Sequence, residues 1–350
     1  MHRLNPYVKN QTIEICTDML SSLILWNGLS RMAAWNYQKG LHETGNGIFS
    51  YLQPDGSWGW SNSGLIVDGG QSLLVDTLFD APMTREMLAI MEDATGISAD
   101  QINTVVNTHA NGDHTHGNGL CTHAEVIASE AGAKEMAAFG PERLSAMMEM
   151  APDLGETGQY FIDIFGPFHF DDVAEKLPTK TFTNELKLKV GDKTVQLKEV
   201  GPAHTLGDIL AFVEEDSTVF TGDILFIDGT PIMWAGPVSN WLKACDLIID
   251  RNPEVIVPGH GPITDVAGVE RVKDYLSYID IETRKRFDSG MTAKDAAFDI
   301  SISDFESWTD AERIAVNVNT LYREYTRDTS TPNTMEIFTL MAEIKRDKRA

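Results

Sequence analysis

The chain has 350 residues, of which 42% are apolar and 23% are charged, so it can bury a large core in one big domain or in one domain with an appendage. Its 52 acidic residues outnumber its 28 basic residues and give a formal net charge of −24. A surface of this sign repels nucleic acid and anionic lipid, which excludes both as expected partners and leaves a small molecule as the expected substrate.

The cysteines and the apolar runs of the sequence indicate the cellular compartment in which the protein is expected. The three cysteines, Cys16, Cys121 and Cys245, are widely spaced and form no Cys-x-x-Cys pair, so neither a disulfide framework nor a structural zinc knuckle is indicated. The most apolar early stretch, residues 19–26, lacks the basic leader and the small-residue cleavage site of a signal peptide. No run approaches the roughly 18 apolar residues of a membrane span. We therefore expect a cytoplasmic protein.

The first part of the chain changes from a helical to a strand period. Apolar residues at helical spacing predict a helical N-terminal extension over residues 1–45. Short apolar runs broken by turn residues then predict strands at 48–52, 63–67 and 72–76, a helix at 82–94 and a strand at 103–107. In an α/β fold of this kind, functional side chains gather at the carboxyl ends of strands.

The rest of the chain is predicted to contain an insert, four more strands and a helical end. A stretch rich in Met and Phe over residues 120–190 resembles helices and a loop rather than sheet, and it is interpreted either as a lid or as ordinary core. The strand period returns at 194–200, 209–213, 218–221 and 255–257. Residues 266–350 are helical in pattern, and residues 309–312 have the spacing of a capping box that opens a helix through Tyr322.

Histidines are concentrated in one short segment. Only 9 His occur in the chain, yet three of them fall in the string THANGDHTH at residues 108–116, directly after a predicted strand. Single His or Asp residues recur after later strands, at His204, Asp223 and His260. A strand followed by a tight Gly or Pro turn fixes a side chain at the sheet edge, which a metal site assembled from distant parts of the chain requires.

These residues resemble the metallo-β-lactamase superfamily. The family pattern is an Asp after an early strand, then His-x-His-x-Asp-His, a lone His, a bridging Asp and a final His. The chain matches it in order over about residues 50–265, at Asp76, then at His109, Asp113 and His114, and then at His204, Asp223 and His260. The resemblance implies a four-layer αββα sandwich at residues 46–265, between an N-terminal and a C-terminal helical extension.

The resemblance also implies two metal sites that share one carboxylate. The first metal would be held by His109, His204 and the residue at 111, the second by Asp113, His114 and His260, and Asp223 would bridge them. Asn111 departs from the pattern, which has a second His at this place. Because an amide oxygen is a poorer zinc ligand than imidazole, the first site is expected to be empty, loosely filled, or filled by manganese or iron, so that the chain binds one or two zinc ions.

Two further residues near the predicted ligands have other implied roles. In the family, Asp76 orients the His-rich loop through hydrogen bonds rather than binding metal. His116 either supplies a ligand in place of Asn111 or points away from the site.

By the same resemblance, the chain is expected to be a metal-dependent hydrolase. A metal-bound hydroxide would attack an ester, lactone, thioester or amide bond of a small, partly apolar substrate. Asp113 would orient the water and pass on a proton, and the amide of Asn111 would donate to the developing oxyanion. The walls of an apolar pocket are expected from the segment after Asp223, with core packing as the equal alternative for its aromatic residues. The candidates are Phe226, Trp234, Trp241 and, from the His-rich loop, His116.

Two other functions remain open from the sequence. Relatives on the same fold hold iron and carry out redox reactions, so an iron-dependent oxidoreductase or dioxygenase is one alternative. A metal-binding protein that has lost turnover is the other. The C-terminal helices have enough apolar surface to pack on the core, to cover the pocket mouth or to form a homodimer contact.

Overall fold

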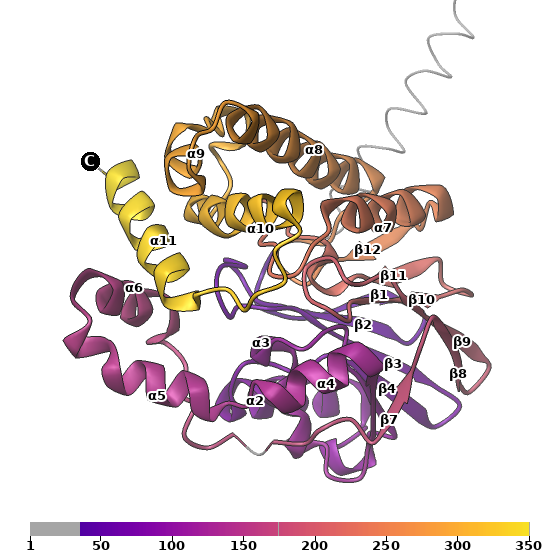
Figure 1. Cartoon of the computed structure of the whole chain (residues 1–350). Helices are drawn as coiled ribbons and strands as arrows, with labels where there is room; N and C mark the ends of the chain where they lie inside the picture. Colours follow the sequence, from indigo (N-terminus) through magenta and orange to yellow (C-terminus); the bar gives the residue numbers. More distant parts are fainter. Residues whose placement is uncertain (1–35, 174, 350) are drawn as a thin grey trace, which may run out of the picture. The chain divides into compact units, whose positions relative to one another are not determined.

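The fold is built on two β-sheets that lie face to face, in a computed structural model that describes residues 36–173 and 175–349 (Figure 1). One sheet has seven strands in the order β1-β2-β3-β4-β5-β6-β7. Its strands are β1 (Gly40–Gly45), β2 (Ile48–Leu52), β3 (Ser63–Asp68), β4 (Gln71–Val75), β5 (Thr104–Val106), β6 (Glu125–Ser129) and β7 (Lys180–Phe182). Strands β1 to β4 pair antiparallel, whereas β4 to β7 pair parallel.

The second sheet has five strands in the order β12-β11-β10-β9-β8. They are β8 (Glu185–Val190), β9 (Lys193–Glu199), β10 (Ile209–Val213), β11 (Thr218–Phe220) and β12 (Val255–Val257). Only β11 and β12 pair in parallel. The two sheets meet closely at Gly64 of β3, where a Cβ atom would lie 2.1 Å from the ring of Phe220 of β11. The absence of a side chain at Gly64 therefore sets how near the sheets approach.

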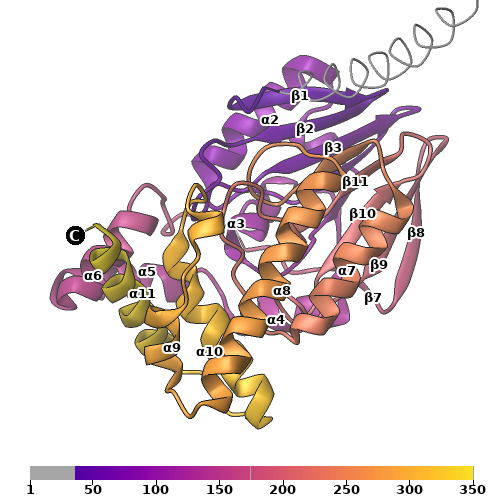
Figure 2. The same ribbon diagram turned by 90° about the horizontal axis from the view of Figure 1, so that it is seen from above.

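Helices cover the outer faces of both sheets (Figure 2). Helix α2 (Ala81–Thr95) buries Met87, Leu88 and Met91 in one cluster with side chains of the seven-stranded sheet. It begins where Asp80 accepts a hydrogen bond from Met83 N, as an N-cap should. Helices α7 (Val238–Arg251) and α8 (Val266–Asp288) share a buried cluster with the five-stranded sheet. The fold class is thus the αββα sandwich that the sequence predicted.

The predicted insert at residues 120–190 is helical only in its middle. Helices α4 (Glu130–Ala138), α5 (Glu142–Met150) and α6 (Gly155–Phe165) occupy that part. The expectation of no sheet is wrong at both ends, because β6 and β7 extend one sheet and β8 forms the edge of the other. Strand β8 alternates polar and apolar residues and β6 contains an apolar run, so both have a strand pattern, whereas β7 has only three residues.

The N-terminal boundary of the sandwich lies earlier than predicted. Residues 40–45, placed in the helical extension 1–45, form β1 and pair with β2 through a tight hairpin. Gly47 allows this turn because its φ is +69°. The part of the predicted extension before residue 36 lies outside the described residues.

The C-terminal extension is helical, as predicted, and packs on the sandwich. After α8 come α9 (Ala293–Asp299), α10 (Ile314–Thr326) and α11 (Thr334–Arg349). Val318 and Leu321 of α10 lie in the same buried cluster as Trp241 of α7 and Leu276 of α8. The sequence left open whether this extension packs on the core, covers a pocket mouth or forms a homodimer contact. These contacts show that it packs on the core.

The capping box predicted at residues 309–312 is wrong. Residues 311–313 form a short 3-10 turn, and α10 begins after it. Asp310 pairs with Arg313 at 3.1 Å, and Glu312 pairs with Lys345 at 2.9 Å. The tertiary ion pair with Lys345 thus takes the Glu312 carboxylate that would have closed the box, and Thr309 Oγ1 donates to Asp310 Oδ2.

Two further observations concern cysteines and membranes. Cys121 and Cys245 are buried free thiols, while Cys16 lies outside the described residues. Among the helices that the structure describes, none is long and apolar enough to cross a membrane.

Candidate metal centre

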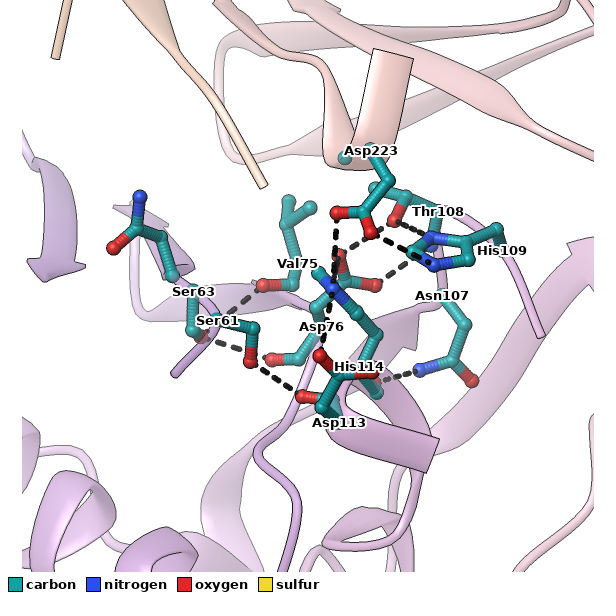
Figure 3. A network of polar contacts seen from close by, with 12 residues as sticks. Ser61, Ser63, Val75, Asp76, Asn107, Thr108, His109, Asp113, His114 and Asp223 are labelled. Atoms are coloured by element: carbon teal, nitrogen blue, oxygen red, sulfur yellow. Dashed lines mark hydrogen bonds and ion pairs between the residues drawn. The ribbon is translucent and has the colours of Figure 1, made fainter. Parts of the chain in front are cut away.

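Side chains from five separate segments meet at the ends of strands of both sheets. Asp76 follows β4, His109 follows β5, His204 lies between β9 and β10, Asp223 follows β11 and His260 follows β12. All five residues are buried. Figure 3 shows how Asp76, His109 and Asp223 converge there.

A single helical turn presents two more of the predicted ligands. In α3 (Gly112–Thr115), Asp113 and His114 are both buried. Ser61 Oγ donates to the carbonyl oxygen of Asp113 at 2.5 Å, and Asn107 Nδ2 donates to that of His114 at 2.9 Å (Figure 3). These bonds fix a turn that is too short to be stable alone.

Backbone carbonyls orient two of the imidazoles. The carbonyl oxygen of Ile232 lies 2.6 Å from His204 Nδ1, and that of Gly56 lies 3.1 Å from His260 Nδ1. A carbonyl oxygen only accepts, so Nδ1 carries the proton in both rings. In the neutral ring Nε2 is therefore the nitrogen with the lone pair, and it faces the centre, as in histidines that bind metal.

Asp76 organises the His-rich loop. Its Oδ2 accepts from His114 Nδ1 at 2.9 Å and from Thr108 Oγ1 at 2.6 Å, and its Oδ1 accepts from Thr108 N at 2.7 Å. Thr108 Oγ1 lies in turn 3.1 Å from His109 Nδ1. The parallel pairing of β4 with β5 brings these residues together. Because both oxygens of Asp76 are occupied, its place is behind the ligands.

Four imidazoles surround the carboxylate of Asp223. Its oxygens lie 3.1 Å from Nε2 of His114, 3.3 Å from that of His204, 3.5 Å from that of His260 and 3.6 Å from that of His109. Asp113 adds a second carboxylate, with Oδ2 3.3 Å from His260 Nε2. This arrangement places several acceptors around one buried point.

The donor set fits a divalent metal. Within the described part of the chain, His109 Nε2, His114 Nε2 and Asp223 Oδ1 are buried without a hydrogen-bond partner. Buried acceptors that face one another are costly unless a positive charge lies between them. Two overlapping groups have ligand atoms within 4.8 Å of one another, namely His109, His114 and Asp223, and Asp113, His114 and His260. Imidazole nitrogen and carboxylate oxygen are the ligands that zinc takes in proteins.

Opposite charges at the centre stabilise the ionised forms of these groups, which burial disfavours. Burial opposes the charged form of Asp223, yet His260, His114 and His109 hold the pKa of this carboxyl well below its usual range. Burial likewise opposes the charged form of His260, yet Asp223 and Asp113 raise the pKa of its imidazole to about 9. The carboxylates therefore remain charged and favour a cation at the centre.

Asn111 lies at the metal centre, next to one of the predicted ligands. Its Nδ2 is 3.1 Å from His204 Nε2, and the side chain is only partly buried. Since His204 Nδ1 carries the proton, Nε2 accepts and the amide of Asn111 donates. His204 is in neither candidate metal group, although its Nε2 also lies 3.3 Å from Asp223 Oδ2.

The four residues expected to line a pocket lie in different environments. Phe226 stacks on His260 with ring centroids 5.1 Å apart, and Trp241 lies 5.9 Å from His204, but both are fully buried and belong to the core. Trp234 keeps partial exposure. His116 does not join the ligands, because its Nδ1 lies 3.2 Å from the carbonyl oxygen of Phe79 and its ring stacks on that side chain.

Several groups that hold the ligands were not found from the sequence. They are Ser61, Asn107, Thr108 and the carbonyls of Gly56 and Ile232. Thr108 could have been found, because it adjoins His109 directly after a strand. The carbonyl groups have no side-chain signature, so no residue pattern marks them.

Replacing Asp76 by Asn is expected to weaken metal binding about 10- to 100-fold, the usual cost of losing a partner of a metal-binding histidine. An amide offers one accepting oxygen, whereas Thr108 and His114 together supply three donors to Asp76. The measurement is competition for zinc against a chromogenic chelator. Asp80→Asn is the control, since Asp80 caps α2 and Asn caps as well. Equal zinc affinity of the Asp76 variant and wild type would contradict this role.

The fold and site have relatives among known proteins. The family model for the metallo-beta-lactamase superfamily matches residues 56–260, more than half of the chain. A curated relative, the beta-lactamase-like protein 2 homolog of Caenorhabditis elegans, is 24% identical over 218 residues, which are 62% of this chain and 61% of that protein. The chain thus matches less than two thirds of that relative's length.

Solved structures share the fold at low sequence identity. The sec-alkylsulfatase Pisa1 from Pseudomonas sp. superposes with a TM-score of 0.63 at 15% identity, over 85% of this chain and 53% of its own. A metallo-beta-lactamase from Pontibacter korlensis superposes with a TM-score of 0.52 at 16% identity, over 69% of this chain and 99% of its own. With its αββα sandwich, its ordered His and Asp residues and the match to the family model, the chain belongs to the metallo-beta-lactamase superfamily.

Proposed function

We propose that this chain is a metal-dependent hydrolase that cleaves an ester, lactone, thioester or amide bond in a small, partly apolar substrate. The convergence of four imidazole Nε2 atoms on the buried carboxylate of Asp223 supports the proposal most directly. Zinc is the proposed metal, with one or two ions per chain and with iron or manganese as the alternatives. When bound, such ions make water acidic near neutral pH and polarise a carbonyl oxygen.

The proposed ligands follow the family order. One ion would be held by His109 and His204, with Asn111 at the weakened position. The other would be held by Asp113, His114 and His260, and Asp223 would contact both. The weakened first site is consistent with the amide of Asn111 donating to His204 Nε2.

Two side chains are proposed to act on the substrate. Asp113 is the more accessible of the two central carboxylates, with 12% of its side chain exposed against 3% for Asp223. It is thus better placed to orient water and carry a proton to the leaving group. The partly exposed amide of Asn111 is proposed to donate a hydrogen bond to the oxyanion that develops during attack.

The apolar part of the substrate is proposed to contact aromatic side chains beside the centre. Trp234 is partly exposed, and its backbone N donates to the carbonyl oxygen of His204 at 2.9 Å. Its ring lies 6.2 Å from that of Phe338 of α11, which also packs 6.0 Å from Trp58. An aromatic wall at this place favours acyl compounds with a hydrophobic part.

Sulfate esters are a second candidate substrate class. The superposition on the alkylsulfatase covers 85% of this chain, against 69% for the Pontibacter β-lactamase, so it includes more of the chain outside the sandwich. Such a substrate also joins an apolar alkyl part to the group that reacts. An alkyl sulfate therefore belongs in any substrate panel.

Metal analysis combined with a substrate panel tests the proposal. The chain, purified without added metal, is analysed by elemental mass spectrometry and is then offered an aryl ester, a lactone, a thioester, a β-lactam and a medium-chain alkyl sulfate. We expect zinc and hydrolysis of at least one acyl compound, both lost after chelation and both restored by zinc. Iron with oxygen consumption would instead support the oxidoreductase, and bound zinc without hydrolysis would support a binding protein.

A further inference from the structure

We infer that helix α10, which lies outside the sandwich, positions His204 for metal binding, and that Asn317 is the main positioning residue. The inference rests on the proposed metal site. It assigns a function to the C-terminal extension, which otherwise only packs on the core.

His204 is enclosed by one irregular segment. The carbonyl oxygen of Ile232 accepts from its Nδ1 at 2.6 Å. Its own carbonyl oxygen accepts from Trp234 N at 2.9 Å and from Ala235 N at 3.1 Å. Both the ring and the backbone of His204 are therefore bonded to residues 232–235, within the segment 230–235.

This segment belongs to neither sheet and cannot position itself. It carries no helix or strand assignment, so no ladder of backbone bonds fixes it. Thr230 N donates to the carbonyl oxygen of Thr309 at 3.0 Å and fixes the beginning of the segment. The carbonyls and N–H groups after that point need partners from other parts of the chain.

Helix α10 supplies those partners from one face. Asn317 Nδ2 donates to the carbonyl oxygen of Pro231, and Asn317 Oδ1 accepts from Met233 N, both at 2.8 Å. These two bonds lie on either side of Ile232, whose carbonyl holds His204. Thr320, three residues further along the helix, donates from Oγ1 to the carbonyl oxygen of Met233 at 2.7 Å.

Arg313 extends the same row of contacts at the start of the helix. Its Nη1 donates to the carbonyl oxygen of Thr230 at 3.0 Å. Residues 313, 317 and 320 are spaced by four and three positions, so they share one helical face. All three side chains are buried.

Asn317 and Thr320 supply the partners that the buried backbone of this segment needs. Asn317 has no exposed surface, and burying an amide costs free energy unless it is fully bonded. Its remaining N–H bonds to Tyr275 Oη at 3.0 Å, which anchors the amide from the helix α8 side. An apolar residue of similar volume would leave the Pro231 carbonyl and Met233 N unpaired and would thus release Ile232, which lies between them.

The test measures zinc affinity of the full chain after removal of metal. Asn317→Leu and Thr320→Val remove the bonds with nearly unchanged volume, and Thr320→Ser keeps the hydroxyl. His204→Ala gives the effect of losing the ligand itself. Thr283→Val is the control, because Thr283 Oγ1, in the neighbouring helix α8, is buried without a partner in the described residues.

We expect Asn317→Leu to weaken zinc binding about tenfold and to change the cobalt(II) absorption spectrum in the same direction as His204→Ala. Thr320→Val should show a smaller change of the same kind, Thr320→Ser should restore the wild-type spectrum, and Thr283→Val should leave it unaltered. If Asn317→Leu does not fold, the two Thr320 variants decide the matter.

Wild-type affinity and spectra in both Asn317→Leu and Thr320→Val would overturn the inference. So would an affinity loss without any spectral change, because general loosening of the fold would explain it. A wild-type chain that binds zinc but hydrolyses nothing would instead refute the proposed function, and it would leave the affinity comparison valid.

Discussion

Asp223→Asn is expected to abolish stable metal binding and to lower hydrolysis about a thousandfold, the rate equivalent of several kcal/mol of lost transition-state stabilisation. The carboxylate of Asp223 lies within 3.6 Å of Nε2 of all four central histidines. An Asn at this place carries no charge, and its NH2 group would replace one of the two acceptor oxygens. The acceptors gathered around it would then lack the negative charge that favours a cation at the centre.

The measurement is metal content by elemental mass spectrometry together with the rate on the best substrate of the panel. Asp299→Asn is the matched control, because Asp299 is a surface carboxylate in α9 that pairs with Arg286. Its change should alter neither quantity, since exposed ion pairs contribute little. Thermal unfolding of both variants separates loss of metal from loss of fold. An Asp223→Asn chain that is folded, free of metal and fully active would refute the metal-dependent mechanism.

The candidate metal-binding residues were visible in the sequence because each one depends on a local feature. His204, Asp223 and His260 each follow a strand and adjoin a Gly or Pro turn, so their place at the sheet edge is set within a few residues. The strands themselves have continuous apolar runs, as in β10, where all five residues are buried. Local patterns of this kind can be recognised in a single sequence.

The supporting structure could not be predicted in the same way, because it depends on pairs of residues far apart in the chain. The path of the backbone places the carbonyls of Gly56 and Ile232 at the centre. No side-chain type in the sequence indicates this path. The sequence places β1 in a helical region because this segment has no alternation of apolar and polar residues. It forms a strand by pairing with β2. The predicted capping box does not form because Lys345, far along the chain, pairs with the carboxylate of Glu312.

For a related reason, the sequence could not decide whether Phe226 and Trp241 line a pocket or pack in the core. The sequence places both residues near the metal ligands but does not show which side of the ligands they face. In the structure they lie behind the imidazoles of His260 and His204 and have almost no exposed surface. Pocket shape is a property of the whole surface, so a list of neighbours in sequence cannot give it.

Asn111→His is expected to have two opposite effects. An imidazole at this position restores the metal ligand that the family pattern has there, so the number of zinc ions per chain should rise toward two. At the same time the variant loses the amide donor that we propose for the oxyanion. Removing one such donor costs about 100-fold in rate, so the variant should bind more zinc and hydrolyse more slowly.

Asn111→Ala separates the two effects, because it removes the amide without adding a ligand. We expect it to slow hydrolysis by a similar factor while leaving the zinc content of wild type unchanged. If Asn111→His binds two zinc ions and reacts faster, the amide is only a weakened ligand and the oxyanion role is wrong. If both variants keep the wild-type rate, Asn111 has no part in the reaction, and its bond to His204 Nε2 serves only to hold that ring in place.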